Sequence, residues 1–272
     1  QKLGQSVGMK VQVHHLPATT TQIEVRQLIE KLNDDKNVDG ILVQLPLPKH
    51  LDSDSLLESI APDKDVDGLT SFNMGRLICG EPQLVPCTPQ ACLKMIESVC
   101  PNLIGKTALV IGRSRLVGKP MFQLLLSKHC TVIQAHSKTE NLHEMCRLAD
   151  IVVVATGQPG LIGADDIKIG AIVIDVGISK LPDGTIKGDV RSDELEGIDF
   201  IVIDPPRAGA LAQCKELAEL NHGRIVMVSC NPKTAARDIK VLIKDGWQLQ
   251  PITPVDQFTY SNHIEIVAVL EK

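Results

Sequence analysis

A regular alternation of apolar segments and helical patterns between residues 107 and 177 most constrains how this chain can fold. Helical patterns at residues 120–129 and 141–149 separate the first three apolar segments. The segments of strand length are Thr107–Gly112, Thr131–His136, Ile151–Gly157 and Ala171–Gly177. Strands that alternate with helices are typical of right-handed βαβ units with a parallel sheet. The sequence therefore predicts an α/β fold.

Further elements are expected on both sides of this alternation. Thr21 and Glu24 have the spacing of a capping box, and apolar residues recur at helical spacing after them. Residues 9–16 alternate between apolar and polar types, and residues 40–48 form an apolar run that ends at prolines, so both are predicted strands. Beyond residue 198, strands alternate with helical patterns again.

Composition excludes several classes of protein. The chain is 43% hydrophobic, which is enough for a buried core, and its net charge of −5 includes no long run of one sign. We therefore expect no DNA partner and no attraction to an anionic membrane. No apolar run approaches the ~20 residues of a membrane-spanning helix. The start lacks both the apolar region of a signal peptide and an initiator Met, so the chain is expected to begin inside a longer ancestor.

The cysteines do not form a metal-binding pattern. All 8 are scattered, no pair has C-x-x-C spacing, and no histidine lies at zinc-ligand spacing from one. We expect reduced thiols, a cytoplasmic location and no metal site.

The segment VIGRSRLVGKP, residues 110–120, is the first candidate for a ligand site. It follows a predicted strand and opens a predicted helix, where free N–H groups bind phosphates in Rossmann domains. Gly112 is present, but Ser114 and Val117 occupy the second and third glycine positions of the usual G-x-G-x-x-G pattern. Pro120 in place of Ser or Thr argues against a Walker loop. On spacing alone, nucleotide binding and an ordinary strand–helix turn both remain open.

The end of the second predicted strand bears on the choice of nucleotide. NAD sites usually have an Asp or Glu there, which binds the ribose 2′-hydroxyl. This strand ends with His136, Ser137 and Lys138, and Arg113 lies in the first loop. Cationic and hydroxyl groups suit a 2′-phosphate, to which each charged hydrogen bond contributes about 1.5–3 kcal/mol. The sequence therefore favours NADP over NAD.

Several long motifs resemble those of the bifunctional methylenetetrahydrofolate dehydrogenase/methenyltetrahydrofolate cyclohydrolase family. They are DGILVQLPLPKH, PDKDVDGLTSFNMGRL, PCTPQACL, VIGRSRLVGKPM, VVVATGQPG and GAIVIDVGI, and the resemblance covers residues 1–197. It implies an oxidoreductase of one-carbon metabolism that passes hydride from 5,10-methylenetetrahydrofolate to NADP. It also implies a hydrolase that converts the methenyl product to 10-formyltetrahydrofolate. Folate would lie between a catalytic N-terminal domain and a Rossmann domain, and the assembly that the resemblance suggests is a homodimer.

The resemblance also implies roles for individual residues. Gln44 would hydrogen-bond the catalytic lysine and position folate, and Asp67 would hold the pterin ring, whose N–H donors suit a fixed carboxylate. The alternatives are a buried amide satisfied by backbone for Gln44 and a turn aspartate for Asp67. The residues that would contact NADP, some of them through backbone atoms, are Gly112, Arg113, Ser114, His136, Ser137, Thr156, Gly157 and Ile178.

Two departures from this family lead us to expect impaired activity. The lysine of the family's Tyr-x-x-x-Lys motif would immediately precede Gln1, and Lys2 does not match it. The family's glycine-rich TPVPGGVGPMT loop, which closes over folate and cofactor, is replaced here by DFIVIDPPRAGA. We expect cyclohydrolase activity to be lost or very weak and dehydrogenase activity to be reduced.

The segment that replaces this loop resembles a different family. DFIVIDPPRAGA, IVMVSCNPKTAARD and VDQFTYSNHIEIVAVL are similar to the C-terminal end of RNA uracil-5-methyltransferases, over residues 199–272. The resemblance implies Cys230 as the nucleophile at uracil C6, Glu265 as the base at C5 and Asp204 in the substrate site. S-adenosylmethionine would be the methyl donor and RNA the partner. Cys230 ends a predicted strand, Arg224–Cys230, and precedes a helix start, where a thiolate is favoured; the alternative is a small buried hydrophobe.

This second resemblance is also incomplete. The family's glycine-rich S-adenosylmethionine loop precedes the DPPR strand, and at that place this chain has the nucleotide domain of the folate family. The RNA-binding domain has no counterpart, and the few aromatic residues offer no substitute for stacking on bases. We therefore expect no methyl transfer.

The sequence as a whole predicts a chimeric α/β chain. We divide it into a truncated folate-binding lobe at residues 1–90, an incomplete NADP-binding Rossmann domain at 91–198 and a methyltransferase-like segment at 199–272. One sheet is expected to continue into the next. Three functions remain open: the folate dehydrogenase/cyclohydrolase, an RNA uracil-5-methyltransferase fragment, and an inactive fusion that only binds nucleotide.

Overall fold

The chain forms two compact units, each with a main sheet of its own. A computed structural model describes residues 10–180, 186–191, 194, 200–203, 209–220, 223–229, 231–255 and 265–272. One unit is Leu16–Arg191, and the other combines Gln1–His15 with Ser192–Lys272. The predicted α/β fold is confirmed.

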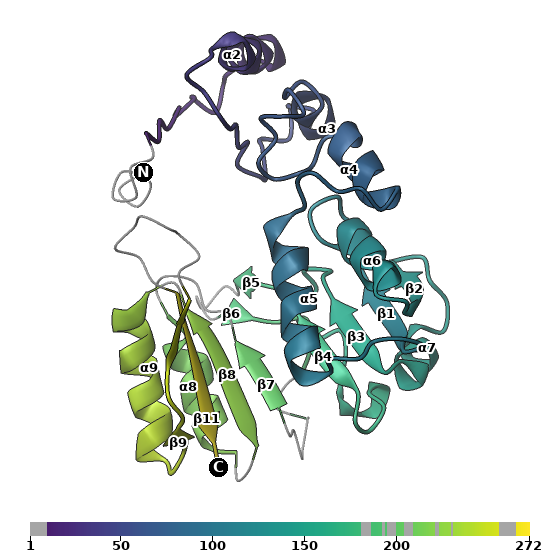
Figure 1. Ribbon diagram of the computed structural model, residues 1–272, viewed down its shortest axis with the longest axis vertical. Helices are drawn as coiled ribbons and strands as arrows, with labels where there is room; N and C mark the ends of the chain where they lie inside the picture. Colours follow the sequence, from purple (N-terminus) through teal and green to yellow (C-terminus); the bar gives the residue numbers. More distant parts are fainter. Residues whose placement is uncertain are drawn as a thin grey trace. The chain divides into compact units, whose positions relative to one another are not determined.

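The unit Leu16–Arg191 is built on a four-stranded parallel sheet (Figure 1). Its strands are β1 (Thr107–Ile111), β2 (Thr131–Ala135), β3 (Ile151–Val154) and β4 (Ile172–Asp175). Their order is β2-β1-β3-β4, and every neighbouring pair is parallel. These are the strands that the sequence predicted, each ending slightly earlier than expected. A short antiparallel ribbon, β5 (Ser179–Lys180) with β6 (Ile186–Lys187), follows them.

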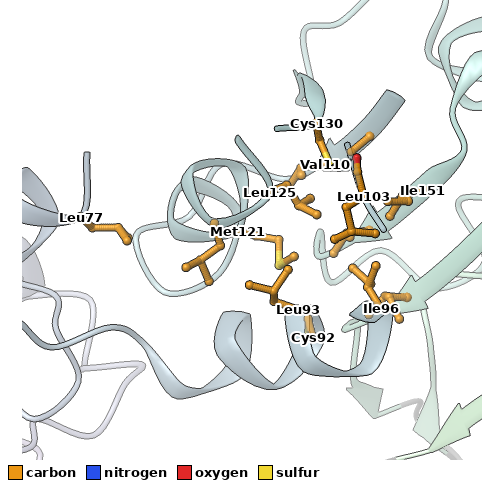
Figure 2. Packing of buried hydrophobic residues seen from close by; sticks show 14 residues of the cluster. Leu77, Cys92, Leu93, Ile96, Leu103, Val110, Met121, Leu125, Cys130 and Ile151 are labelled. Carbon is orange, nitrogen blue, oxygen red and sulfur yellow. Dashed lines mark hydrogen bonds between the residues drawn. The ribbon is translucent and has the colours of Figure 1, made fainter. Parts of the chain in front are cut away.

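Two helices share the main core of this unit with the sheet. α5 (Cys87–Val99) and α6 (Gly118–Ser127) pack against each other (Figure 1). Figure 2 shows side chains of both helices pointing into the space between them and β1. Ile96, Met121 and Leu125 are completely buried there. Burial of each such side chain contributes about 1.5–3 kcal/mol, so the cluster fixes α6, and the loop before it, against the sheet.

The part of this unit before α5 consists of short helices and loops. At the N-terminus of the first helix, the predicted capping box is confirmed: the Thr21 hydroxyl accepts from the Glu24 N–H, and the Glu24 carboxylate accepts from the Thr21 N–H. The last helix before α5 reaches the main core through Leu77. The helices are α2 (Gln22–Asp34), α3 (Ser53–Leu57) and α4 (Ser71–Ile78); two later elements of the unit are α7 (Leu142–Leu148) and the 3₁₀ turn η1 (Ala164–Asp166).

The two strands predicted before residue 50 are wrong. The described residues 10–16 form no strand, and residues 40–48 make only an isolated bridge between Ile41 and Asp65. Prolines in the second run remove N–H donors, and no described strand lies beside it to pair with. Its apolar residues instead pack singly: Ile41 is buried among residues of α2 and α3, whereas Leu42 is exposed.

The second unit has a mixed five-stranded sheet with the order β10-β11-β8-β7, in which β9 also pairs with β11. Figure 1 labels β7, β8, β9 and β11 of this sheet. β7 and β8 are parallel, and β11 runs antiparallel to β8. A core of its own includes Trp247, Leu242 and Ile225, all nearly or fully buried. The elements are β7 (Phe200–Ile203), α8 (Leu211–Ala218), β8 (Arg224–Ser229), α9 (Pro232–Lys244), β9 (Gln248–Leu249), β10 (Thr253–Val255) and β11 (Glu265–Glu271).

The predicted continuation of one sheet into the next stays a prediction. Within the second unit, the described part of β7 pairs with β8 in parallel across α8, which makes a βαβ unit.

Candidate functional site

The candidate site lies at the carboxyl ends of β1 and β3, where the strand order of the parallel sheet reverses. β1 lies between β2 and β3, so the chain crosses from one side of β1 to the other after β2. Ligands of open α/β sheets bind at such a point. Gly112 follows β1 with φ +125°, and a Cβ atom there would lie 2.3 Å from the carbonyl oxygen of Ala155, which follows β3. Only glycine lets the two loops approach so closely.

The loop from Gly112 to Gly118 brings the start of α6 to the same place. A Cβ atom on Gly118 would lie 2.2 Å from the carbonyl oxygen of Gly112. The Ser114 hydroxyl accepts hydrogen bonds from the N–H groups of Val117 and Gly118, at 3.1 and 3.4 Å. Gly112 and Gly118 thus allow the close backbone packing that glycines provide in dinucleotide-binding loops, and Ser114 orders the turn between them.

The two arginines of this loop have different environments. Arg115 forms ion pairs with Glu58 and, at 3.6 Å, with Asp54. Arg113 is exposed, and in the part of the chain that the structure describes it has neither an ion pair nor a hydrogen bond. A guanidinium group with no protein partner is suited to a phosphate ligand.

A pocket of about 350 Å³ joins this loop to the helical part of the same unit. The loop contributes Arg113 and Ser114, and the earlier part of the chain contributes Leu45, Leu57 and Leu69. The pocket therefore combines an apolar wall with a charged edge, where the Asp54 carboxylate accompanies the cationic side chains, and it suits a ligand that has a charged group and a ring or an apolar face.

The turn after β2 holds the next set of residues expected to meet the cofactor. The His136 N–H donates to the Thr139 hydroxyl at 2.8 Å, and the Lys138 N–H donates to His136 Nδ1 at 3.1 Å. These bonds fix the imidazole within the turn, whereas Ser137 and Lys138 are exposed. The turn therefore presents a hydroxyl and an ammonium group to solvent.

The turn after β3 is held by Asp189, a residue that the sequence analysis missed. Asp189 is completely buried, and one carboxylate oxygen accepts from the N–H groups of Thr156 and Gly157, at 2.6 and 2.9 Å. The Thr156 hydroxyl donates to the same oxygen at 2.8 Å. The backbone N–H groups near Thr156 and Gly157 thus donate to the protein itself. No local pattern reveals this, because the acceptor lies over 30 residues later in the chain.

Asp175, at the end of β4, fixes Asp189 in turn. Its carboxylate accepts from the N–H groups of Asp189 and Val190, both at 3.0 Å. A Cβ atom on Gly177 would lie 2.1 Å from Asp189 Cγ, and one on Gly188 would lie 2.0 Å from Asp175 Oδ2. The two aspartates therefore need these glycines beside them. Ile178, the last residue expected at the cofactor, follows this network and is largely exposed.

Asp65 and Asp67 of the KDVDG motif differ in their hydrogen bonding. Asp65 is buried, and its carboxylate accepts from the N–H groups of Leu69 and Thr70 and from the Asn73 amide, at 3.1, 2.8 and 2.9 Å. Asp67 is half-buried and has no hydrogen-bond partner among the described residues. Burial, and then the negative charge of Asp65, raise the pKa of the Asp67 carboxyl above its usual value. Asp65 is therefore the turn aspartate whose carboxylate accepts hydrogen bonds from its own loop. The Asp67 carboxylate accepts none from the described residues and can accept hydrogen bonds from a ligand.

Gln44 is exposed, so the alternative of a buried amide is wrong. Its side-chain nitrogen donates to the carbonyl oxygen of Leu45 at 3.1 Å. Leu45 lines the pocket with Arg113 and Ser114, which places Gln44 next to that pocket in the chain.

The residues of the second candidate site are not described. Cys230 and Asp204 lie outside the described residues, and Glu265 begins β11 but its side chain is not described. The residues on either side of Cys230 agree with the predicted strand before it and helix after it. Ser229 ends β8, and the Asn231 side chain caps α9 by accepting from the Lys233 N–H at 3.2 Å.

Two further observations concern ligands and membranes. Across the described ranges, no three His, Cys, Asp or Glu side chains are grouped so that they could hold a metal ion. None of the helices that the structure describes has the length and apolar character needed to cross a bilayer.

A glycine-packed loop at the switch point of a parallel sheet is the arrangement found in Rossmann-type nucleotide-binding domains. The family model of the tetrahydrofolate dehydrogenase/cyclohydrolase NAD(P)-binding domain matches residues 86–211. The family model of the catalytic domain of the same enzymes matches residues 1–67.

Known relatives agree with these matches. The bifunctional protein FolD of Rhodospirillum rubrum is 51% identical over 199 residues, which are 71% of this chain and 67% of the relative. FolD of Zymomonas mobilis is 50% identical over 203 residues, 74% of this chain and 68% of the relative. The crystal structure of the Campylobacter jejuni enzyme, at 45% identity, superposes with a TM-score of 0.66 over 69% of this chain and 67% of that one. The chain therefore belongs to the tetrahydrofolate dehydrogenase/cyclohydrolase family and spans about two thirds of the length of these relatives.

A further match concerns the end of the chain. The family model of tRNA (uracil-5-)-methyltransferases matches residues 188–272. It overlaps the NAD(P)-binding match over residues 188–211. The change of resemblance expected near residue 198 therefore falls inside a segment that both families match.

We expect Asp189→Ala to lower the free energy of unfolding by about 1–3 kcal/mol, because it leaves the N–H groups of Thr156 and Gly157 without their acceptor. Urea denaturation measures the loss, and hydrogen exchange at these two amides should accelerate. Asp165→Ala, which removes an exposed carboxylate from the same unit, is the matched control and should change stability by less than about 0.5 kcal/mol. Equal effects of the two substitutions would contradict the assigned role.

Proposed function

We propose that this chain is an NADP-dependent methylenetetrahydrofolate dehydrogenase with an associated methenyltetrahydrofolate cyclohydrolase activity, and that both activities are impaired. The observation that carries the proposal is the pocket in which Arg113 and Ser114 of the nucleotide loop meet Leu45, the neighbour of Gln44. Hydride transfer needs cofactor and folate in one shared space, held within reacting distance. Segments matching the NAD(P)-binding domain and the catalytic domain of the family line this pocket together.

The residues of the loop fit a dinucleotide phosphate. Gly112 and Gly118 let the backbone pack closely at the start of α6, and Arg113 offers a guanidinium group that has no partner among the described residues. Ser137 and Lys138 add a hydroxyl and an ammonium group suited to a 2′-phosphate. NADP, when bound, supplies the ring that accepts hydride. The turn at Thr156 and Gly157 would contact the bound NADP through van der Waals packing, because the N–H groups of these two residues already donate to Asp189.

The folate side of the proposal depends on Asp67 and Gln44. Asp67 has a carboxylate without a hydrogen-bond partner among the described residues, and a pterin ring has N–H donors that match it. The exposed Gln44 would position the same substrate beside the pocket. Neither residue titrates as a strong base, so both serve binding and orientation in this proposal.

The test is a spectrophotometric assay of the 272-residue chain with methylenetetrahydrofolate and NADP, which follows the methenyl product and its decay. We expect oxidation, and we expect Asp67→Asn to lower kcat/KM about ten- to a hundredfold through a lost charged hydrogen bond. The pKa of Asp67 is raised, so the wild-type kcat/KM should fall on acidification at a higher pH than an ordinary aspartate would give. In Asp67→Asn this acid limb should disappear.

The exposed Asp63 provides the matched control, because Asp63→Asn removes a nearby carboxylate and should leave kcat/KM unchanged. Absence of oxidation in the wild-type chain would refute the dehydrogenase, and hydrolysis as fast as oxidation would refute the expected impairment.

We expect NADP to bind more tightly than NAD, because Arg113 and the turn at Ser137 face solvent without an acidic residue in the turn. Arg113→Met should reduce NADP affinity about ten- to a hundredfold and leave NAD affinity nearly unchanged. Calorimetric titration of both nucleotides measures this. Equal affinity of the wild-type chain for the two nucleotides would show that no 2′-phosphate site is present.

The match over residues 188–272 supports a second candidate, methylation of RNA uracil with S-adenosylmethionine through Cys230, Glu265 and Asp204. We expect no transfer, because the sequence has no counterpart of the family's glycine-rich S-adenosylmethionine loop to hold the methyl donor in line with uracil C5, and positioning supplies much of such a barrier. Incubation with labelled S-adenosylmethionine and a uracil-rich RNA measures it, with Cys230→Ala as control. Incorporation above that control would establish the second function, and NADP binding without any turnover would indicate a binding-only fusion.

A further inference from the structure

We propose that Arg115 and Glu58 form a latch that positions the nucleotide loop and ties it to the loop carrying Asp67. The two residues are far apart in the chain, and neither was expected at the site from the sequence. The inference rests on the proposed function, because it assigns them a role at the same cofactor and folate sites.

Glu58 closes the base of the Asp67 loop. It lies at the end of α3, and its two carboxylate oxygens accept from the N–H of Ser71 at 3.0 and 3.1 Å. The Ser71 hydroxyl donates to the same carboxylate at 2.7 Å, and Ser71 is the first residue of α4. The carboxylate therefore lies at the positive end of a helix and holds the ends of the segment 58–71 together.

Arg115 connects this closure to the nucleotide loop. One guanidinium nitrogen, Nη2, donates to the Glu58 carboxylate and lies 3.4 Å from the Ser71 hydroxyl. The other, Nη1, lies 3.6 Å from Asp54. The side chain of Arg115 is only 22% exposed, whereas that of Asp54 is 78% exposed, so Glu58 is the partner that matters.

The charge state of Glu58 suits this role. Burial alone would raise the pKa of its carboxyl, but hydrogen bonds from Arg115 and Ser71 bring the pKa below its usual value. Glu58 is therefore ionised at neutral pH, and its charge-assisted bonds to Arg115 are stronger than bonds between neutral groups.

The latch predicts different roles for the two arginines of the loop. Arg113 has no protein partner among the described residues and is free to discriminate between NADP and NAD. Arg115 is engaged by Glu58, so it acts as a positioning residue: it orders the loop around Ser114 before the ligand arrives. A loop ordered in advance loses less conformational entropy on binding, whichever nucleotide binds.

The experiment is calorimetric titration of the full chain with NADP and with NAD, in Arg115→Met, Glu58→Gln and the double variant, with Arg113→Met as the matched control. Arg115→Met should weaken both nucleotides about two- to tenfold and leave their affinity ratio unchanged. Glu58→Gln should also weaken nucleotide binding. The affinity of the double variant should be no lower than that of the single variant with the larger loss, because both substitutions break the same interaction. Arg113→Met should instead change the ratio. Arg115→Lys, which keeps the charge, should recover part of the loss.

Three outcomes overturn the latch. Unchanged affinity for both nucleotides in Arg115→Met would show that the pair of Arg115 and Glu58 does not contribute to nucleotide binding. A changed ratio in that variant would make Arg115 a direct phosphate ligand. Tighter NADP binding in Glu58→Gln would mean that Glu58 normally prevents Arg115 from binding a phosphate of NADP.

A second measurement works without any nucleotide. Hydrogen exchange at the Ser71 amide and at the amides of Val117 and Gly118 should accelerate in Arg115→Met and Glu58→Gln, while exchange within β1 stays unchanged as a control for folding. Unchanged exchange at all three amides overturns the latch. If the wild-type chain binds neither nucleotide, the proposed function fails, and exchange still decides whether the latch exists.

Discussion

The contact between Gly112 and the backbone of Ala155 is the constraint on which the candidate site depends. It brings the loops after β1 and β3 together at the switch point, and Gly118 brings the start of α6 to the same place. Asp189 then fixes the loop after β3, and Asp175, after β4, fixes Asp189. The carboxyl ends of three neighbouring strands are thus joined by backbone packing and by carboxylates that accept backbone N–H groups. A ligand bound there meets a rigid surface, and a rigid surface holds reacting groups more precisely than free loops do.

Two separate cores explain how this chain can resemble two families. The core between α5, α6 and β1 shares no described residue with the core around Trp247. Each sheet is hydrogen-bonded within its own unit, where β7 pairs with β8 and β4 pairs with β3. The residues that support the proposed dehydrogenase, including Arg113, Asp67 and Gln44, all belong to the unit Leu16–Arg191. The segment that both families match, residues 188–211, begins inside this unit and includes Asp189, which holds the turn after β3.

The sequence predicted those parts of the fold that depend on neighbouring residues. The four strands of the parallel sheet and the capping box of α2 were predicted because their apolar spacing and cap are local patterns. The run at 40–48 has the same apolar character but no strand beside it, so packing overrode strand propensity. Asp189 and the pair of Arg115 with Glu58 were missed for a related reason. Their partners lie tens of residues away, and only the folded chain brings them together.

Two motifs of this chain each contain two like-charged residues two positions apart. In each motif, one of the two residues binds other protein groups and the second has no partner among the described residues. In KDVDG, Asp65 is buried and accepts three hydrogen bonds, whereas Asp67 has no described partner. In GRSR, Arg115 is paired with Glu58, whereas Arg113 is free among the described residues. A residue engaged by the protein fixes the backbone, and the backbone then presents its neighbour to a ligand without further cost in entropy. Under the proposed function, this division would leave Asp67 and Arg113 as the residues that meet the ligands.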